Sequence, residues 1–499
     1  MSVAFWAERQ PEAVAVAAPT GDRTFAELNG NANRVGRLLR RRGLKELDRV
    51  LLLCGNRAEF AETVQATVRT GLRVTTLNWH LTADEASYIA EDCGARAIIA
   101  AADLGAVAAA MAERTPRLTT RLAVGGRIDG FEDYTAVIAE EDGSDVADPV
   151  LGGAMLYTSG TTGRPKGVYR RRVDPAVPAL NAIYGYRPGE DRHLCTGPLY
   201  HAAPLAFSLA VPLQCGVGVT LMPVWDVAEC LRLLAMDRIT HTHMVPTMFH
   251  RLLAVPADER STVDTSALRF VVHGAAPCPV GVKQALMEWL GPIVHEYYAA
   301  TEGTGTWITA EQWLEHPGSV GRAILPDGVM VGDEHGERLP AGETGLVYLR
   351  AAKVDPFEYL GDPEKTRSTY RGEWFTLGDV GHLDEDGWLF LTDRSANLII
   401  TGGVNVYPAE VDTVLLGHPA VGDVAVIGVP SEEWGEEVKA VVELQPGYQP
   451  DESLAAELMV FCRDRLAHFK CPRSVDFVET LPRLDNGKIY KRRLREQYR

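Results

Sequence analysis

Residues 157–172 read YTSGTTGRPKGVYRRR and gather hydroxyl side chains, glycines and cations into one short stretch. The residues that lead into it, GAMLY (153–157), have the apolar character of a short buried strand. Glycine lets a backbone approach a ligand and turn its N–H groups toward it, while the serine and threonine hydroxyls and the Lys166 ammonium supply further donors. The stretch therefore predicts a strand followed by a loop that binds a polyphosphate.

The spacing within this loop differs from the Walker pattern G-x-x-x-x-G-K-[ST]. Five residues after Gly160 lies Pro165, where the pattern requires glycine, and Gly167 follows Lys166 where it requires serine or threonine. The loop thus disfavours a P-loop NTPase.

Length and composition set broad limits. A chain of 499 residues exceeds the usual size of a single core, which predicts a large domain and a smaller one. The eight cysteines form no CxxC pair, and no secretory signal is visible, so we expect a reduced, cytoplasmic setting. A formal net charge of −17 disfavours nucleic acid as a partner, because polyanions would be repelled.

One stretch resembles a membrane span. No residue between His201 and Asp226 carries a formal charge, but prolines and glycines interrupt the run. We expect a buried helix followed by the strand VGVTLM (217–222), and no integral membrane segment.

YTSGTTGRPKG resembles the phosphate-loop signature of the AMP-forming adenylating enzymes, a superfamily that includes the acyl-CoA synthetases. Six further stretches, one before this loop and five after it, occur in the order that is typical of the family, so the resemblance covers nearly the whole chain. They are RTFAELNGNANRVGRLL (23–39), HGAAP (273–277), YYAATEG (297–303), FTLGDVGHLDEDGWLFLTDR (375–394), GGVNVYPAEVD (402–412) and PRLDNGK (482–488).

The resemblance implies a multidomain α/β fold. Residues 1–393 would form a large N-terminal domain of β-sheets flanked by helices, with the ATP and acyl pockets. Residues 394–396 would be a hinge, and residues 397–499 a small, mobile α+β domain that carries the catalytic lysine. The sequence after residue 394 agrees with this, because it reads as strand, glycine turn, helix and strand.

The resemblance also implies an AMP-forming acid–thiol ligase that uses ATP, Mg²⁺ and CoA. A carboxylate resists attack by a thiol because its leaving group would be oxide, so it must first become a mixed anhydride with AMP. Negative charge then builds on the phosphoryl oxygens and on pyrophosphate, which requires cations and fixed donors. The implied catalytic residues are Lys488, Thr301, Glu302 and His201, with Glu302 and Thr158 also holding Mg²⁺.

The nucleotide and acyl residues are carried over in the same way. Tyr298 would stack on adenine, the backbone of residues 274–276 would line the adenine slot, and Asp379 would accept hydrogen bonds from the ribose. The implied ATP and AMP site is Thr158, Ser159, Gly160, Thr161, Thr162, Gly163, Lys166, Gly274, Ala275, Ala276, Tyr298, Asp379 and Arg394. The implied acyl pocket is His201, Ala202, Val245, Gly274, Ala299 and Ala300, and Gly402 and Gly403 would border the CoA channel.

The acyl pocket residues are mostly small or apolar, which favours a hydrophobic acid of aryl, alicyclic, polycyclic or fatty type. The stretch YHAAP (200–204) lacks the aspartate with which amino-acid-activating relatives hold an ammonium group, so an amino acid is disfavoured. The sequence leaves open which acid is used and whether two copies associate as a homodimer.

One position departs from the family pattern. Ala396 stands where the family usually has Asp or Lys as the hinge pivot, and alanine cannot make the pivot's polar contacts. This predicts a shifted balance between the two half-reactions, with thioester formation from an acyl-adenylate favoured. A ligase that loads a carrier protein is the alternative, and a non-enzymatic binding protein is disfavoured by the retained site residues.

Overall fold

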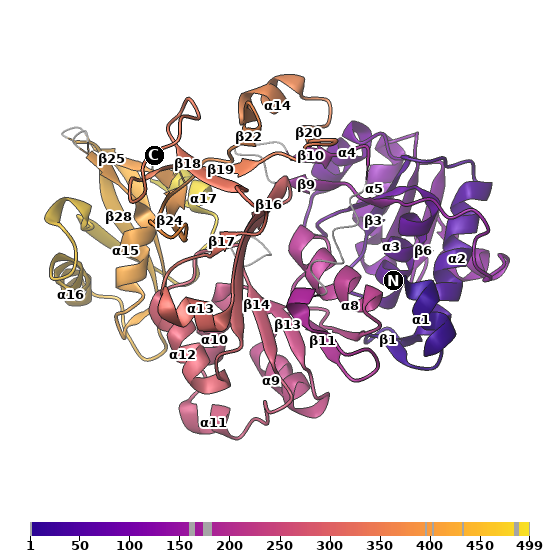
Figure 1. Ribbon diagram of the computed structural model, residues 1–499, viewed down its shortest axis with the longest axis horizontal. Helices are drawn as coiled ribbons and strands as arrows, with labels where there is room; N and C mark the ends of the chain where they lie inside the picture. Colours follow the sequence, from indigo (N-terminus) through magenta and orange to yellow (C-terminus); the bar gives the residue numbers. More distant parts are fainter. Residues whose placement is uncertain are drawn as a thin grey trace. The chain divides into compact units, whose positions relative to one another are not determined.

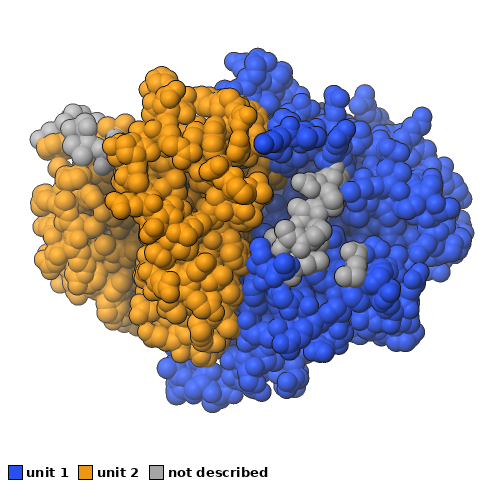
Figure 2. Space-filling model, viewed as in Figure 1, with its two compact units in different colours: residues 1–244, 255–272, 352–368 blue, residues 245–254, 273–351, 369–499 orange. Residues whose placement is uncertain are grey.

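The computed structural model describes residues 2–158, 165–172, 182–394, 397–401, 404–431, 434–483 and 489–498. The chain divides into two compact units (Figure 2). Unit 1 comprises residues 1–244, 255–272 and 352–368, and unit 2 comprises residues 245–254, 273–351 and 369–499. Each unit mixes helices and sheets. The predicted hinge at residues 394–396 stays a prediction.

Unit 1 contains a six-stranded parallel sheet between two layers of helices (Figure 1). In spatial order its strands are β7 (Glu132–Asp133), β6 (Thr120–Val124), β5 (Ala97–Ala101), β3 (Arg49–Leu53), β4 (Arg73–Thr76) and β8 (Gly153–Ala154). The helices are α1 (Val3–Arg9), α2 (Phe25–Arg41), α3 (Ala58–Thr70), α4 (Ala83–Asp92), α5 (Gly105–Arg114) and α6 (Tyr134–Ala139).

Alternate residues of β3 enter two different cores. Val50 and Leu52 pack with α2 and α3, whereas Leu51 and Leu53 pack with α4 and α5. Because both faces of the sheet are covered, its central strands are uniformly apolar rather than alternating.

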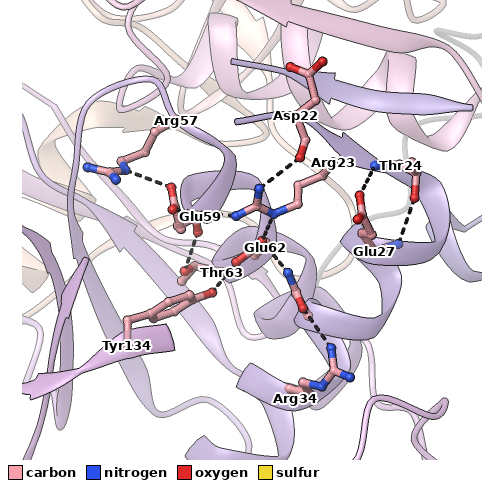
Figure 3. A network of polar contacts seen from close by, with 11 residues as sticks. Asp22, Arg23, Thr24, Glu27, Arg34, Arg57, Glu59, Glu62, Thr63 and Tyr134 are labelled. Atoms are coloured by element: carbon pink, nitrogen blue, oxygen red, sulfur yellow. Dashed lines mark hydrogen bonds and ion pairs between the residues drawn. The ribbon is translucent and has the colours of Figure 1, made fainter. Parts of the chain in front are cut away.

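A buried carboxylate joins several elements of unit 1 (Figure 3). Glu62 of α3 accepts hydrogen bonds from Arg23 Nε at 2.7 Å, Asn31 Nδ2 at 2.8 Å and Tyr134 Oη at 2.7 Å. Its side chain has no exposed surface, so these three donors replace the water that the charge loses. The network ties α3 to β2, α2 and α6, with β2 spanning Arg23–Thr24.

A second sheet of unit 1 carries parallel strands in the order β13, β11, β12 and β1, with β2 antiparallel at the edge. The strands are β13 (His241–Met244), β11 (Arg192–Cys195), β12 (Gly218–Leu221) and β1 (Val14–Ala17), and α9 (Val227–Met236) and α11 (Ala257–Ser261) follow β12 and β13 in the chain.

The uncharged stretch before Asp226 forms a π-helical turn (Pro204–Ala210), α8 (Val211–Gln214) and β12. The prediction of a buried helix followed by a strand is confirmed. Among the residues that the structure describes, no helix has the length and apolarity needed to cross a bilayer.

Unit 2 contains two further groups of strands. The antiparallel β15 (Val294–Ala300), β16 (Gly303–Ile308) and β17 (Arg322–Ala323) form the first. The second has the order β21 (Tyr370–Arg371), β22 (Trp374–Phe375), β19 (Gly345–Arg350), β23 (Asp379–Leu383) and β24 (Leu389–Arg394), with β18 (Val329–Gly332) also paired to β19. The helices are α10 (Pro246–Leu253), α12 (Val280–Leu290) and α13 (Ala310–Glu315).

The C-terminal part of unit 2 is an α+β arrangement with its own core. Its strands are β25 (Ile399–Thr401), β26 (Val404–Val406), β27 (Val421–Ser431), β28 (Gly435–Leu444) and β29 (Ser474–Val478), and its helices are α15 (Pro408–Leu415), α16 (Glu452–Arg463) and α17 (Lys491–Gln497). Val411 of α15, Val424 and Val442 of the β27–β28 pair and Leu458 of α16 meet in this core. The predicted succession of strand, helix and strand is confirmed in the residues described.

Candidate functional site

The strand before the predicted phosphate loop and the residues after the loop form a hairpin in unit 1. β9 (Leu156–Thr158) and β10 (Lys166–Tyr169) are antiparallel, and their register places Thr158 opposite Lys166. The single buried strand predicted over residues 153–157 is instead two short strands, β8 and β9, which belong to different sheets and are separated by Met155, and Leu156 and Tyr157 are only half-buried. The predicted loop residues Ser159, Gly160, Thr161, Thr162 and Gly163 lie outside the described residues.

Lys166 has an acidic and an aromatic neighbour. Its Nζ lies 3.8 Å from Asp362 Oδ2 and 5.5 Å from the centre of the Tyr359 ring. Tyr359 belongs to β20 (Glu358–Tyr359), which pairs with β10, and Asp362 precedes α14 (Pro363–Thr369). Because Asp362 is 42% exposed, the ion pair is weak, and a phosphate could replace the carboxylate at Lys166.

A turn of small residues follows β14 (Phe270–His273). At Gly274 a β-carbon would lie 2.6 Å from Tyr297 Cζ and 2.7 Å from the Tyr297 carbonyl oxygen, well inside van der Waals contact. The next residue, Ala275, has a φ of +69°, in the left-handed region that residues with side chains rarely adopt. Residues 274–276 therefore offer backbone rather than bulky side chains to a neighbouring ligand.

We predict that Gly274→Ala lowers the free energy of unfolding by about 1–3 kcal/mol, because the added methyl group must displace the Tyr297 ring or backbone. Urea unfolding of purified protein measures the change. Gly281→Ala is the matched control, since no atom lies within 4 Å of a β-carbon there and the residue is within α12. The control should be neutral or stabilising by up to about 1 kcal/mol, and equal losses in both variants would contradict the prediction.

Tyr298 and Asp379 form a pair within unit 2. Tyr298 Oη donates a hydrogen bond to Asp379 Oδ2 at 2.7 Å, joining β15 to the first residue of β23. The register of β23 and β24 places Arg394 opposite Asp379. An aromatic ring and a carboxylate held side by side match the two needs of a nucleoside, a stacking surface for the base and an acceptor for ribose hydroxyls.

Thr301 and Glu302 form the two-residue connection between β15 and β16. Ala300 pairs with Gly303 across this hairpin, and Ala299 pairs with Thr304. Glu302 is buried and Thr301 is half-buried. The structure thus brings Tyr298, Ala299, Ala300, Thr301 and Glu302 together on one strand and its turn.

The remaining described candidates lie at the starts of helical segments. In unit 1, His201 and Ala202 lie three and two residues before the π-helical turn, and the His201 ring lies 4.4 Å from the Tyr200 ring, centre to centre. In unit 2, Val245 is the residue before α10. The candidates Ala396, Gly402, Gly403 and Lys488 and the side chain of Arg394 lie outside what the structure describes.

The sequence interpretation missed a buried charged cluster beside the turn at residues 274–276. Lys283 of α12 donates to Glu296 Oε2 of β15 at 2.7 Å, and His273 Nε2 lies 3.3 Å from the same oxygen. In the sequence, Lys283 lies in a stretch with helical periodicity and Glu296 lies in a predicted strand. Neither pattern shows that the two side chains are partners.

Comparison with known proteins agrees with these features. The family model described as AMP-binding enzyme matches residues 3–354, and the model for the C-terminal domain of AMP-binding enzymes matches residues 410–488. This chain belongs to the AMP-binding enzyme family. The predicted family and fold class, a large N-terminal and a small C-terminal domain in a mixed α/β fold, are confirmed.

Three similar AMP-binding enzymes illustrate the range of the family. The long-chain-fatty-acid–CoA ligase FadD13 of Mycobacterium tuberculosis (strain ATCC 25618 / H37Rv) is 33% identical over 95% of this chain and 93% of that protein. The fatty acid–[acyl-carrier-protein] ligase ScoC of Streptomyces coeruleorubidus is 32% identical over 100% of this chain and 96% of that protein. The crystal structure of the anthranilate CoA ligase AuaEII in complex with anthranoyl-AMP has a TM-score of 0.89 and 26% identity, covering 100% of this chain and 97% of that one.

Proposed function

We propose that this AMP-binding enzyme is an acyl-CoA ligase for a hydrophobic carboxylic acid. In the first half-reaction a carboxylate oxygen of the acid attacks the α-phosphorus of ATP, and pyrophosphate leaves. In the second, the CoA sulfur attacks the acyl carbon, the thioester forms and AMP leaves. The proposal is supported by family membership over most of the chain and by relatives that are acid–thiol ligases.

The single structural observation that carries the proposal is the Tyr298–Asp379 pair. Both side chains belong to unit 2, as does the turn at residues 274–276. We assign the Tyr298 ring to adenine, the Asp379 carboxylate to the ribose hydroxyls and the backbone of the turn to the edge of the base. A carboxylate acceptor and an aromatic face of this kind fit a nucleoside.

The reacting phosphates require positive charge and donors. We assign this role to Lys488, Lys166, Thr301 and the hydroxyl-rich loop, with Mg²⁺ bound through Glu302 and Thr158. When it is bound, the metal would stabilise negative charge on the phosphates. The buried Glu302 carboxylate suits Mg²⁺, which prefers oxygen ligands. His201 is proposed to guide the acid's carboxylate toward the α-phosphorus.

The acyl pocket proposed here is formed by His201, Ala202, Val245, Gly274, Ala299 and Ala300. Small side chains leave volume for an aryl, alicyclic, polycyclic or fatty acyl group, and none of these residues has a carboxylate to hold the ammonium group of an amino acid. Gly402 and Gly403 are proposed to border the channel for the pantetheine arm.

A pyrophosphate-release assay over fatty, aryl and alicyclic acids, with and without CoA, tests the proposal. We expect release to depend on one class of hydrophobic acid and the thioester to appear only when CoA is present. If no acid elicits pyrophosphate release and no acyl-CoA forms, the proposal is wrong.

The thiol acceptor has one alternative, because ScoC joins its acid to an acyl carrier protein. A phosphopantetheinylated carrier protein added in place of CoA separates the two acceptors. Faster acyl transfer to the carrier than to CoA would identify a carrier-protein ligase.

We predict that Ala396→Asp speeds adenylation relative to thioester formation, because a polar pivot restores hinge contacts that alanine lacks. A change on the order of 10-fold in the ratio of the two single-turnover rates corresponds to about 1.4 kcal/mol. Rapid-quench measurements with ATP plus acid, and separately with premade acyl-adenylate plus CoA, give the two rates. Equal rates in the wild type and the variant for both steps would contradict the prediction.

A cytoplasmic location is also proposed. All eight cysteines are free, and seven of them are buried. Burial raises the pKa of Cys54, Cys195 and Cys230 to about 12, which keeps these thiols protonated and unreactive.

A further inference from the structure

Unit 2 contains a buried cluster of ionisable side chains from three elements, namely His273 at the end of β14, Lys283 of α12 and Glu296 of β15. Lys283 Nζ and His273 Nε2 lie 2.7 Å and 3.3 Å from the same atom, Glu296 Oε2. The side chains of His273 and Lys283 have no exposed surface, and that of Glu296 is 6% exposed. The Lys283 ammonium also lies 4.7 Å from the centre of the Trp313 ring.

Glu296 and Lys283 keep their charges by mutual compensation, whereas burial lowers the pKa of His273. Burial acts to raise the pKa of Glu296, but His273 and Lys283 outweigh it, and the pKa of Glu296 is lowered. Burial lowers the pKa of Lys283, opposed by the charge of Glu296. A carboxylate and an ammonium taken out of water together depend on each other, so removing one leaves the other without compensation.

The cluster stands immediately beside the proposed nucleotide residues. His273 directly precedes the turn at residues 274–276, and Glu296 is two residues before Tyr298 on the same strand. Residues two apart on a strand project from the same face, so Glu296 and Tyr298 share a face of β15. The close approach of Gly274 to Tyr297 leaves little freedom between the turn and the strand, so a shift at the cluster is passed on to both.

We propose that Glu296 is a positioning residue for the nucleotide, acting through its contacts with Lys283 and His273. By fixing the end of β14 against β15, it holds the turn and the Tyr298 ring at the separation that accepts the base. This inference rests on the proposed function and assigns a further residue to it.

Glu296→Gln tests the inference, since glutamine keeps the shape of the side chain and removes its charge. We expect the Kd for MgATP, measured by calorimetry, and the KM for ATP to rise by about 10-fold, while kcat at saturating ATP changes by less than about threefold. The matched control is Glu62→Gln, because Glu62 is also buried and accepts hydrogen bonds from one arginine and two neutral side chains that belong to no proposed site (Figure 3). Both variants should lose thermal stability, but only Glu296→Gln should weaken nucleotide binding.

The double variant Lys283→Met/Glu296→Gln separates positioning from stability. It carries no unpaired buried charge, so it should unfold at a higher temperature than Glu296→Gln, yet its Kd for MgATP should stay raised. A double variant with wild-type Kd, or equal increases in Kd for Glu296→Gln and Glu62→Gln, would overturn the inference. If the wild type itself binds no MgATP, the proposed function fails instead, and the two failures are thereby distinguished.

Discussion

Replacing Lys488 with alanine is expected to slow acyl-adenylate formation by about 10²- to 10³-fold, while thioester formation from supplied acyl-adenylate remains largely intact. An ammonium about 4 Å from a phosphoryl oxygen contributes roughly 4 kcal/mol at an effective dielectric constant of about 20, before desolvation. That contribution accelerates adenylation when it acts mainly in the transition state. It is absent from the second half-reaction, in which no pyrophosphate leaves. Single-turnover measurements of each half-reaction report the two effects separately.

The tail that carries Lys488 also offers a matched control. On either side of this segment, Arg483 and Ile489 form an antiparallel bridge, and Tyr490 N donates to the Pro482 carbonyl oxygen at 2.7 Å. Arg492→Ala removes one positive charge from α17, the helix that follows, where the side chain is 55% exposed and pairs with Glu496 one turn further along the helix, at 3.2 Å. We expect Arg492→Ala to leave both half-reactions within about twofold. Equal losses of both half-reactions in Lys488→Ala would contradict a role limited to adenylation.

Much of the fold could be predicted because the relevant information is local. The uncharged stretch before Asp226 and the strand–helix–strand succession after residue 394 each reflect a pattern within about 30 residues. Such patterns specify an element without reference to the rest of the chain.

The pairing of side chains within the candidate site could not be predicted in the same way. Tyr298 and Asp379 are 81 positions apart, and no local pattern links them. Lys283 and Glu296 would each be read as a solvated charge, because a buried ion pair differs from two surface charges only in what covers it. The left-handed conformation of Ala275 likewise could not be predicted from its residue type, because alanine rarely adopts a positive φ.

The strands that carry Tyr298 and Asp379 are both paired with neighbouring strands. β15 is held by β16, and β23 by β19 and β24, so Tyr298 and Asp379 project from elements with partners along their edges. A rigid framework of this kind keeps a stacking surface and an acceptor in fixed relation, which is what recognition of a nucleoside requires.

Asp379→Ala is expected to lower kcat/KM for ATP by about 10²-fold, because hydrogen bonds to a charged acceptor contribute about 1.5–3 kcal/mol each and the proposed ribose contacts would be lost. The loss should appear mainly as weaker nucleotide binding, measured by calorimetry with MgATP. Tyr298→Phe keeps the ring for stacking and removes only the hydroxyl that orients Asp379 at 2.7 Å, so its effect should be smaller, about 10-fold.

Asp386→Ala is the matched control for Asp379→Ala, because it removes the same charge from the exposed connection between β23 and β24. This control should bind MgATP like the wild type, since an exposed carboxylate is screened by solvent. If Asp379→Ala folds and binds MgATP as tightly as Asp386→Ala, the carboxylate does not contact the nucleotide. If the Asp379 carboxylate binds the ribose and the Tyr298 hydroxyl orients it, the Kd for MgATP should be highest for Asp379→Ala, intermediate for Tyr298→Phe and lowest for Asp386→Ala.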